Sequence, residues 1–207
     1  MICGRVDSRL PSGRKDEGRI HRKQVWIKKE VTNPPKTIMS QYRRAYQHGG
    51  CYFFTVVTYK RVKYLAEPEN IQRLRDAFQH VMSSYPFTID AIVILPNHIH
   101  CIWTLPKVDT DFSIRWRLIK RYVSVGINVA LTRRGEKRVW QRRFWEHLIR
   151  NEKDWQRHMD YIHYNPVKHG FVKSPIDWPH RSFETAVKRG YYERDWGGDE
   201  PVIIKNM

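Results

Sequence analysis

The sequence predicts an α+β fold, a ferredoxin-like antiparallel sheet with helices on one face. Three observations predict it. An aromatic and β-branched run occupies residues 51–59, two further strand-like runs meet at Pro96-Asn97, and helical apolar spacing follows the first and third of these runs. The resulting order, strand, helix, two strands, helix, favours an antiparallel sheet packed against its helices.

The composition points to a polyanion as the partner. The chain has 207 residues with 38 Lys+Arg against 21 Asp+Glu, a formal charge of +17. An anionic membrane is the weaker alternative, since no 18-residue apolar run, lipidation motif or signal-peptide core is visible. Three cysteines without CxxC spacing suit a reducing cytoplasm. We therefore expect a cytoplasmic, nucleoid-associated protein with no membrane partner.

The chain divides near residue 40. Residues 1–40 hold ten basic and four acidic residues, few apolar ones, and Pro34-Pro35. We predict a basic, flexible N-terminal extension, which either binds phosphates or is a solvated tail. A third alternative is that translation starts at Met39, directly before the globular part. Residues 41–207 are predicted to form the catalytic domain, including a C-terminal tail.

The first strand and helix follow from local pattern. Residues 51–59, CYFFTVVTY, combine β-branched and aromatic side chains typical of a strand. Pro68 suits the first turn of a helix that ends before Tyr85-Pro86. Its core face is formed by residues at helical spacing, namely Ile71, Leu74, Phe78 and Val81.

The next two strands form a predicted hairpin. Residues 87–95 lead into Pro96-Asn97, and residues 98–105 run back. Alternate side chains of a strand share a face, so His98 and His100 point the same way while Ile99 points to the opposite layer. Two adjacent imidazoles on a rigid strand are the beginning of a divalent metal site.

A second helix is predicted over residues 111–131. Its apolar stripe contains Phe112, Trp116, Ile119 and Val123. Its basic residues lie mostly off that stripe and form either a solvated face or a phosphate-binding one: Arg115, Arg117, Lys120 and Arg121.

Basic and aromatic residues then alternate. The loop 133–138 is basic, and Trp140, Arg142 and Arg143 belong to the run WQRRFW at 140–145. This pattern suits single-stranded nucleic acid, in which rings stack on bases and guanidinium groups hold phosphates. Alternatively, the aromatic residues are core and only the arginines are outside.

A third helix is predicted from the N-cap Asn151 to about Asn165, before Pro166. Trp155, Met159 and Ile162 share a face that should pack on the sheet. A polar face lies about a quarter-turn away and contains Asp154, His158, Tyr161 and Asn165.

These residues suggest a phosphodiester-cleaving site. His98 and His100 would hold a divalent ion, and an Asn165 oxygen would favour Mg²⁺ or Mn²⁺ over Zn²⁺. Tyr161 would attack phosphorus and store the energy of the cut strand in a phosphotyrosine bond.

Each residue of this suggested site also has a purely structural explanation. His-x-His occurs by chance, a helical tyrosine is usually structural, and Asn165 before Pro166 can simply end a helix. His163, Tyr164 and His169 are near enough in sequence to compete for the same roles. A zinc site including Cys101 is disfavoured because Cys101 alternates to the other face.

Several long motifs carry a family resemblance. They occur in order between Tyr42 and Asp199: YRR at 42–44, GG at 49–50, FFT at 53–55, LPNHIHCIWTLP at 95–106, WQRRFWEH at 140–147 and DYIHYNPVKHG at 160–170. The body of the chain thereby resembles the REP-associated tyrosine transposases, a branch of the HUH single-strand endonucleases related to single-tyrosine insertion-sequence transposases. No counterpart is recognised for residues 1–40.

The resemblance implies an HUH-type fold and a metal-dependent single-stranded DNA endonuclease and strand transferase. It implies that His98 and His100 are metal ligands, that Tyr161 is the nucleophile forming a 5′-phosphotyrosine link, and that Asn165 stands at the place of the third ligand. The implied substrates are single-stranded DNA hairpins from extragenic palindromes, with a flanking tetranucleotide. The expected nucleic-acid contacts include Arg43 and Arg44 of the first motif, and the protein is expected to be a monomer or homodimer.

Two other functions fit the composition. One is a non-enzymatic hairpin DNA- or RNA-binding regulatory protein, against which the intact His98, His100 and Tyr161 argue. The other is an RNA-processing nuclease, because a basic groove does not by itself distinguish DNA from RNA.

Overall fold

The computed structural model describes residues 44–198 and Pro201. The predicted N-terminal extension 1–40 and the predicted DNA contact Arg43 lie outside these described residues, so those predictions stay untested.

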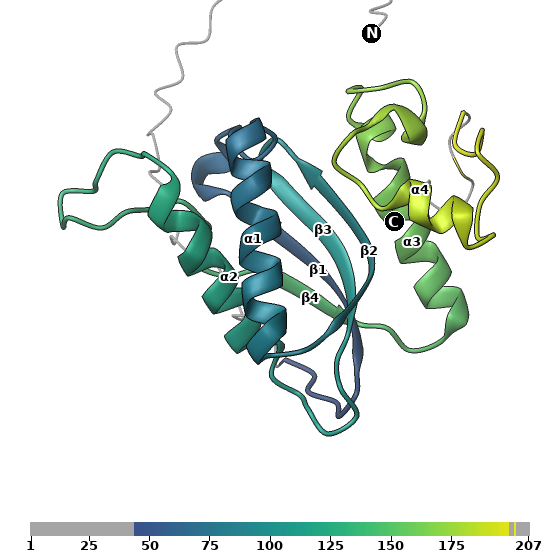
Figure 1. Ribbon diagram of the computed structural model, residues 1–207, viewed down its shortest axis with the longest axis horizontal. Coiled ribbons are helices and arrows are strands. Elements are labelled where there is room, and N and C mark those ends of the chain that lie inside the picture. The colour runs from purple at the N-terminus through teal and green to yellow at the C-terminus, as the bar shows by residue number, and fades with distance from the viewer. Residues whose placement is uncertain (1–43, 199–200, 202–207) are drawn as a thin grey trace, which may run out of the picture. The chain divides into compact units, whose positions relative to one another are not determined.

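Four antiparallel strands form the sheet, in the order β2-β3-β1-β4 (Figure 1). They span Cys51–Val57 (β1), Thr88–Leu95 (β2), His98–Thr104 (β3) and Trp145–Leu148 (β4). The predicted hairpin of β2 and β3 is confirmed, with Leu95 opposite His98. The strand order is that of a ferredoxin-like sheet, and the α+β fold class is confirmed.

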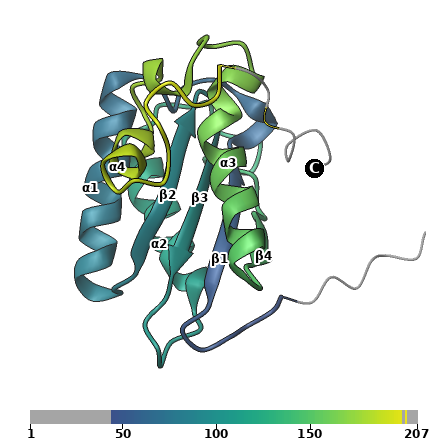
Figure 2. The ribbon, with the colours of Figure 1, turned by 90° about the vertical axis from the view of Figure 1, so that its right-hand side faces the viewer.

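Two helices cover one face of the sheet, as expected (Figures 1 and 2). They are α1 (Pro68–Ser84) and α2 (Phe112–Gly126). Pro68 stands at the start of α1, and the Asp111 side chain caps α2 by accepting a hydrogen bond from the Ile114 N–H at 2.9 Å. Trp103 and Trp116 stack at 4.3 Å between ring centroids at the centre of this apolar layer.

Two more helices cover the opposite face, which the prediction of helices on one face did not include. They are α3 (Glu152–Lys168) and α4 (Phe183–Lys188) (Figure 2). Met159 and Ile162 of α3 pack with Phe53, Val93 and other side chains of the sheet in a second core. The sheet is therefore buried on both faces, because each face carries apolar side chains that need cover.

Some element boundaries differ from the prediction. Helix α3 continues through Pro166 to Lys168, because a proline near a helix end removes only one N–H, and His169 N–H still bonds to the Asn165 carbonyl. Helix α2 ends at Gly126 rather than near residue 131. Strand β4 was not predicted, since its four residues, WEHL, carry too short a pattern; pairing with Tyr52–Thr55 of β1 forms it.

Two short 3-10 segments complete the fold, at Tyr59–Arg61 and Pro175–Asp177. Within residues 44–198, no helix combines the length and apolar character needed to cross a membrane.

Candidate active site and metal centre

The histidine pair lies on β3 and faces helix α3. In the register of the sheet, His100 is opposite Thr55 and His98 is opposite Val57 of β1. The two imidazole centroids are 4.7 Å apart, and both side chains are buried. The prediction that the two rings share a face is confirmed, because the strand alternates regularly at this point.

Each ring engages one of its nitrogens with a neighbouring side chain. Nδ1 of His98 donates to Oδ1 of Asn97 at 2.6 Å, because an amide oxygen can only accept. Nδ1 of His100 lies 2.9 Å from Oγ1 of Thr55. These contacts fix the ring orientations and leave both Nε2 atoms available for a metal ion, the outer-shell arrangement found around histidine ligands.

The electrostatic surroundings keep both imidazoles neutral. Burial lowers the pKa of His98 to about 4, helped by the charges of His169 and Arg61 and opposed by the Asn165 amide. Burial also lowers the pKa of His100 well below its usual value, with His98, His169 and Lys168 acting in the same direction. A neutral imidazole is the form that binds metal.

Helix α3 places Tyr161 over the histidine pair. The Tyr161 ring centroid is 5.0 Å from that of His100 and 5.9 Å from that of Phe53. The ammonium of Lys168 lies 5.1 Å from the centroid of the Tyr161 ring. A phenol, two imidazoles and a cation, from a strand and a helix about sixty residues apart in sequence, thus meet at one end of the sheet.

Asn165 supplies a polar side chain that lacks a normal partner. It is fully buried, and although its amide is near enough to raise the pKa of His98, neither side-chain atom makes a hydrogen bond of ordinary geometry with the described residues. A buried amide without a partner costs free energy unless something binds it. Beside two free imidazole nitrogens, this donor set fits a divalent ion.

The structure separates the three residues that competed for these roles. His163 is buried against Phe183 and Tyr192 in the second core, away from a ligand position. Tyr164 is also buried and packs toward Trp196. His169 does reach the site, with its ring 5.3 Å from that of His98.

Three residues near the site were not singled out from the sequence. Thr55 stands only within the motif FFT, and Arg61 follows the first strand outside any of the motifs. Arg61 adopts a positive φ of 55°, and its charge acts on the His98 pKa. Lys168 was quoted only within its motif. A left-handed non-glycine residue beside an active site is a recognisable signal, but it exists only in three dimensions.

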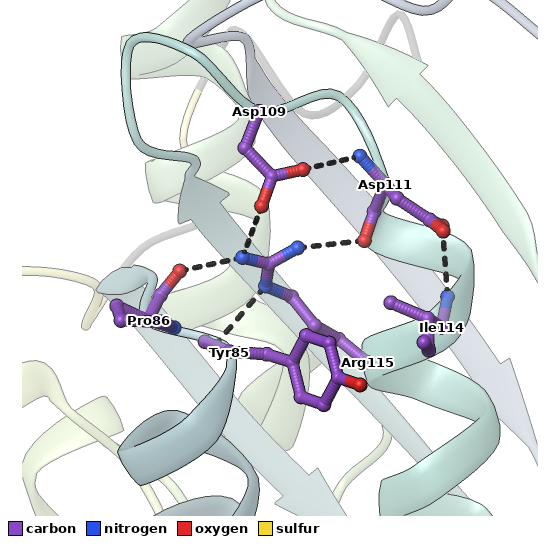
Figure 3. Close-up of polar contacts among 6 residues, drawn as sticks. All are labelled: Tyr85, Pro86, Asp109, Asp111, Ile114 and Arg115. Atoms are coloured by element: carbon purple, nitrogen blue, oxygen red, sulfur yellow. Dashed lines mark hydrogen bonds and ion pairs between the residues drawn. The ribbon is translucent and has the colours of Figure 1, made fainter.

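The prediction that Arg115 contacts nucleic acid is wrong. Its side chain is 1% exposed, and it donates hydrogen bonds to three backbone carbonyls and to the carboxylate of Asp109 at 2.7 Å (Figure 3). Arg115 therefore joins the end of α1 to the start of α2. Because Arg115 lies next to the apolar stripe of α2, beside Trp116, its side chain is buried in the protein rather than exposed to solvent.

Trp140 also belongs to the core rather than to a stacking surface. It is 8% exposed, and its indole N–H donates to the Lys120 carbonyl at 3.2 Å. Lys120 in turn donates to the Gln141 carbonyl, and burial with the nearby charge of Arg44 lowers its pKa to about 8. The aromatic ring of this segment that faces solvent is Trp145, which is 48% exposed.

The remaining predicted contacts divide by exposure. Arg44 is half-buried in an ion pair of 3.2 Å with Glu146 and lies over the Phe144 ring. Four of the predicted nucleic-acid contacts are exposed: Arg117, Arg121, Arg142 and Arg143. These four keep the predicted role open.

Comparisons with known proteins agree with this geometry. Residues 45–165 match the family described as transposase IS200-like. A REP-associated tyrosine transposase of Escherichia coli K12 is 50% identical over 161 residues, covering 78% of this chain and 93% of that protein. A putative REP-associated tyrosine transposase of Haemophilus influenzae is 44% identical over 175 residues, covering 81% and 98%.

A solved structure is also similar. It is that of a REP-associated tyrosine transposase bound to a REP hairpin, with 49% sequence identity and a TM-score of 0.69, covering 79% of this chain and 94% of that one. The similarity therefore includes nearly the whole of each relative.

Proposed function

This chain belongs to the IS200-like transposase family, among its REP-associated tyrosine transposases, and we propose that it cuts and rejoins single-stranded hairpin DNA through Tyr161. The observation that carries the proposal is the position of the Tyr161 ring, 5.0 Å from His100 and 5.1 Å from the Lys168 ammonium. The nucleophile, a metal-binding pair and a cation come from one and the same chain.

His98, His100 and Asn165 are the proposed ligands of a divalent ion, which the family generally requires. The asparagine oxygen favours a hard ion such as Mg²⁺ or Mn²⁺. When bound, such an ion polarises the scissile phosphate and neutralises its developing charge. Asn97 and Thr55 hold the two imidazoles in the orientation that leaves Nε2 free.

Tyr161 performs the covalent step. Its phenol oxygen attacks phosphorus while the bond from phosphorus to the 3′-oxygen breaks, giving a 5′-phosphotyrosine and a strand that ends in a 3′-hydroxyl. The phenol proton is lost and the leaving oxygen gains one, so the step is balanced. A 3′-hydroxyl can later attack the phosphotyrosine and restore a phosphodiester, which releases Tyr161.

Lys168 assists this step electrostatically. Its ammonium lies over the Tyr161 ring, where a positive charge stabilises the phenolate as the proton leaves. His169, whose ring lies 5.3 Å from that of His98, is a further polar group beside the proposed metal site.

Hairpin DNA is the proposed substrate because a similar protein was solved with a REP hairpin. The exposed Arg142 and Arg143 precede Trp145, whose ring lies 5.6 Å from that of Phe53, on the α3 side of the sheet. Arginines beside an exposed indole suit a single strand that reaches the site. Arg117, Arg121 and the Arg43–Arg44 motif are the other proposed contacts, and a monomer or homodimer is expected.

The test is capture of the covalent intermediate. A hairpin oligonucleotide with flanking single strands, labelled at its 3′ end, is incubated with Mg²⁺ or Mn²⁺ and resolved on a denaturing protein gel. The 3′ label is chosen because a 5′-phosphotyrosine retains the downstream fragment. We expect wild type to form a labelled adduct and Tyr161→Phe to form none, while both bind the hairpin equally.

Tyr191→Phe is the matched control, because Tyr191 is 50% exposed and its ring contacts Trp155 near the start of α3. If Tyr161→Phe formed as much adduct as wild type, the assignment of Tyr161 as the nucleophile would be refuted. Tight hairpin binding by wild type without any adduct would favour the regulatory binding protein. Equal cleavage of a matched RNA hairpin would instead favour the RNA-processing nuclease.

A further inference from the structure

A second cluster of metal-ligating side chains lies on the same face of the sheet. His147 projects from β4, and Asp154 and His158 come from the first two turns of α3. Nε2 of His147 lies 2.8 Å from one Asp154 carboxylate oxygen, and Nδ1 of His158 lies 3.2 Å from the other. We propose that these three side chains form a second metal site, which takes a Zn²⁺-like transition ion.

The distances suit a shared ion. One donor atom from each residue lies within 4.8 Å of the donors of the other two. Donors that bind a first-row ion at roughly 2.0–2.2 Å are separated from one another by about 3 Å in tetrahedral or octahedral geometry. The two rings are stacked with centroids 4.7 Å apart, the same spacing as in the His98–His100 pair.

The protonation states are those of ligands. Burial lowers the pKa of His158, which keeps its imidazole neutral, with opposing contributions from Asp154. Burial alone would raise the pKa of Asp154, but hydrogen bonds from His147 and the Arg150 N–H outweigh it, so the carboxylate is charged. The surrounding charges include Arg157, which acts on His158 and opposes the binding of a cation.

The donor set selects the class of ion. Two imidazoles and one carboxylate suit Zn²⁺, Co²⁺ or Fe²⁺, whereas Mg²⁺ prefers oxygen ligands. The second site therefore differs in selectivity from the site of His98, His100 and Asn165. Without an ion the cluster holds itself together, because Asp154 also accepts from the Arg150 N–H at 3.0 Å and His158 contacts the Asp154 carbonyl.

The location suggests what the ion would do. It would link the first two turns of α3 to strand β4 at the edge of the sheet in the same chain. His158, the last of the three ligands in sequence, lies three residues before Tyr161. The Phe53 ring lies between the two sites, 4.7 Å from His158 and 5.5 Å from His100. If the proposed function is correct, such a clamp favours attack by Tyr161 within its own subunit, and so the ion is a positioning element.

The experiment counts ions rather than activity. His98→Ala/His100→Ala removes the first site and leaves the second intact. We expect this variant to bind one Co²⁺ or Zn²⁺ per chain by calorimetry and elemental analysis, with a visible Co²⁺ absorption band, and to gain thermal stability on binding. Adding His147→Gln and His158→Gln should weaken this binding by roughly 100-fold or more, since two of three ligands are lost.

Controls keep the result interpretable. Asp154→Asn retains an oxygen for the Arg150 N–H and is used if the glutamine variants lose their circular dichroism signal. His80→Gln, at an exposed position of α1, should change nothing. A His98→Ala/His100→Ala protein that binds no ion, or whose binding survives His147→Gln/His158→Gln, overturns the second site.

This outcome is independent of the covalent adduct of Tyr161, which tests the proposed function separately.

Discussion

The Thr55 hydroxyl and the His100 imidazole face each other across the pairing of β1 with β3, with Oγ1 and Nδ1 2.9 Å apart. The contact orients a ring that is 4% exposed. It therefore ties the geometry of the proposed metal centre to the register of the sheet.

Thr55→Val should weaken metal binding at His100 while leaving the Tyr161 nucleophile in place. The valine has nearly the same shape but cannot hydrogen-bond, so His100 is free to turn away. Loss of such an outer-shell partner typically costs about 10–100-fold in metal affinity. The measurement is the Mn²⁺ concentration that gives half-maximal covalent adduct with the labelled hairpin.

Thr55→Ser retains the hydroxyl and should behave like wild type in this titration. A Val variant with an unchanged Mn²⁺ requirement would show that Thr55 does not orient the ligand.

Lys168→Met should slow adduct formation by about 10–100-fold at pH 7, because a cation that stabilises the phenolate of Tyr161 is lost. The measurement is the rate of adduct formation at saturating DNA.

Lys168→Arg preserves the charge and should recover most of the rate. A Lys168→Met protein that forms the adduct at the wild-type rate would contradict this role of Lys168.

Arg115→Met should destabilise the protein by about 2–4 kcal/mol, because it breaks an ion pair whose Arg115 side is buried and leaves backbone carbonyl oxygens without their donor. The substitution leaves Asp109 and the carbonyls of Tyr85 and Pro86 without their donor. Urea denaturation followed by circular dichroism measures the loss.

Arg117→Met provides the contrast on the same helix. Its side chain is exposed, so the stability should change by less than about 0.5 kcal/mol while hairpin affinity falls modestly. Equal stability of the two variants would contradict the assignment of Arg115 to the interior.

Asp160→Asn should change how stability depends on pH. Burial raises the pKa of Asp160, although Tyr192 and Gln156 donate hydrogen bonds to one of its oxygens at 2.7 Å each. The folded protein therefore retains a proton over a pH range in which the unfolded chain has released it. Stability falls as pH rises through that range, between the ordinary pKa of an aspartate and the raised one.

Asparagine keeps the accepting oxygen and does not titrate. We therefore expect the free energy of unfolding of Asp160→Asn to exceed that of wild type at pH 7, and the difference to vanish near pH 3, where both side chains are neutral. Urea denaturation at several pH values checks this. A difference that does not vary with pH would show that burial of the charge is not its cause.

Local pattern alone predicted much of this fold. Alternation along residues 98–105 put His98 and His100 on one face, Pro68 and Asn151 marked the starts of helices, and the element order indicated the sheet. These features depend on backbone geometry within a few residues, which a sequence encodes directly. The family motifs added the identity of Tyr161 and Asn165 as expected site residues.

Other features depended on contacts between distant segments. The four residues of β4 are a strand only because β1 offers them a partner, and Arg115 is interior only because α1 ends next to it. Trp140 and Trp145, five residues apart in one basic run, have opposite surroundings for the same reason.

Local pattern thus specifies which groups are available: two imidazoles on one strand face, and a phenol and an amide one turn apart on a helix. Whether these groups meet depends on tertiary packing, because the face of the sheet on which α3 packs, and its register there, are set by the second core around Phe53. The same packing brings His147 to Asp154 and His158. The periodicity within one element does not predict the distances between side chains of different elements.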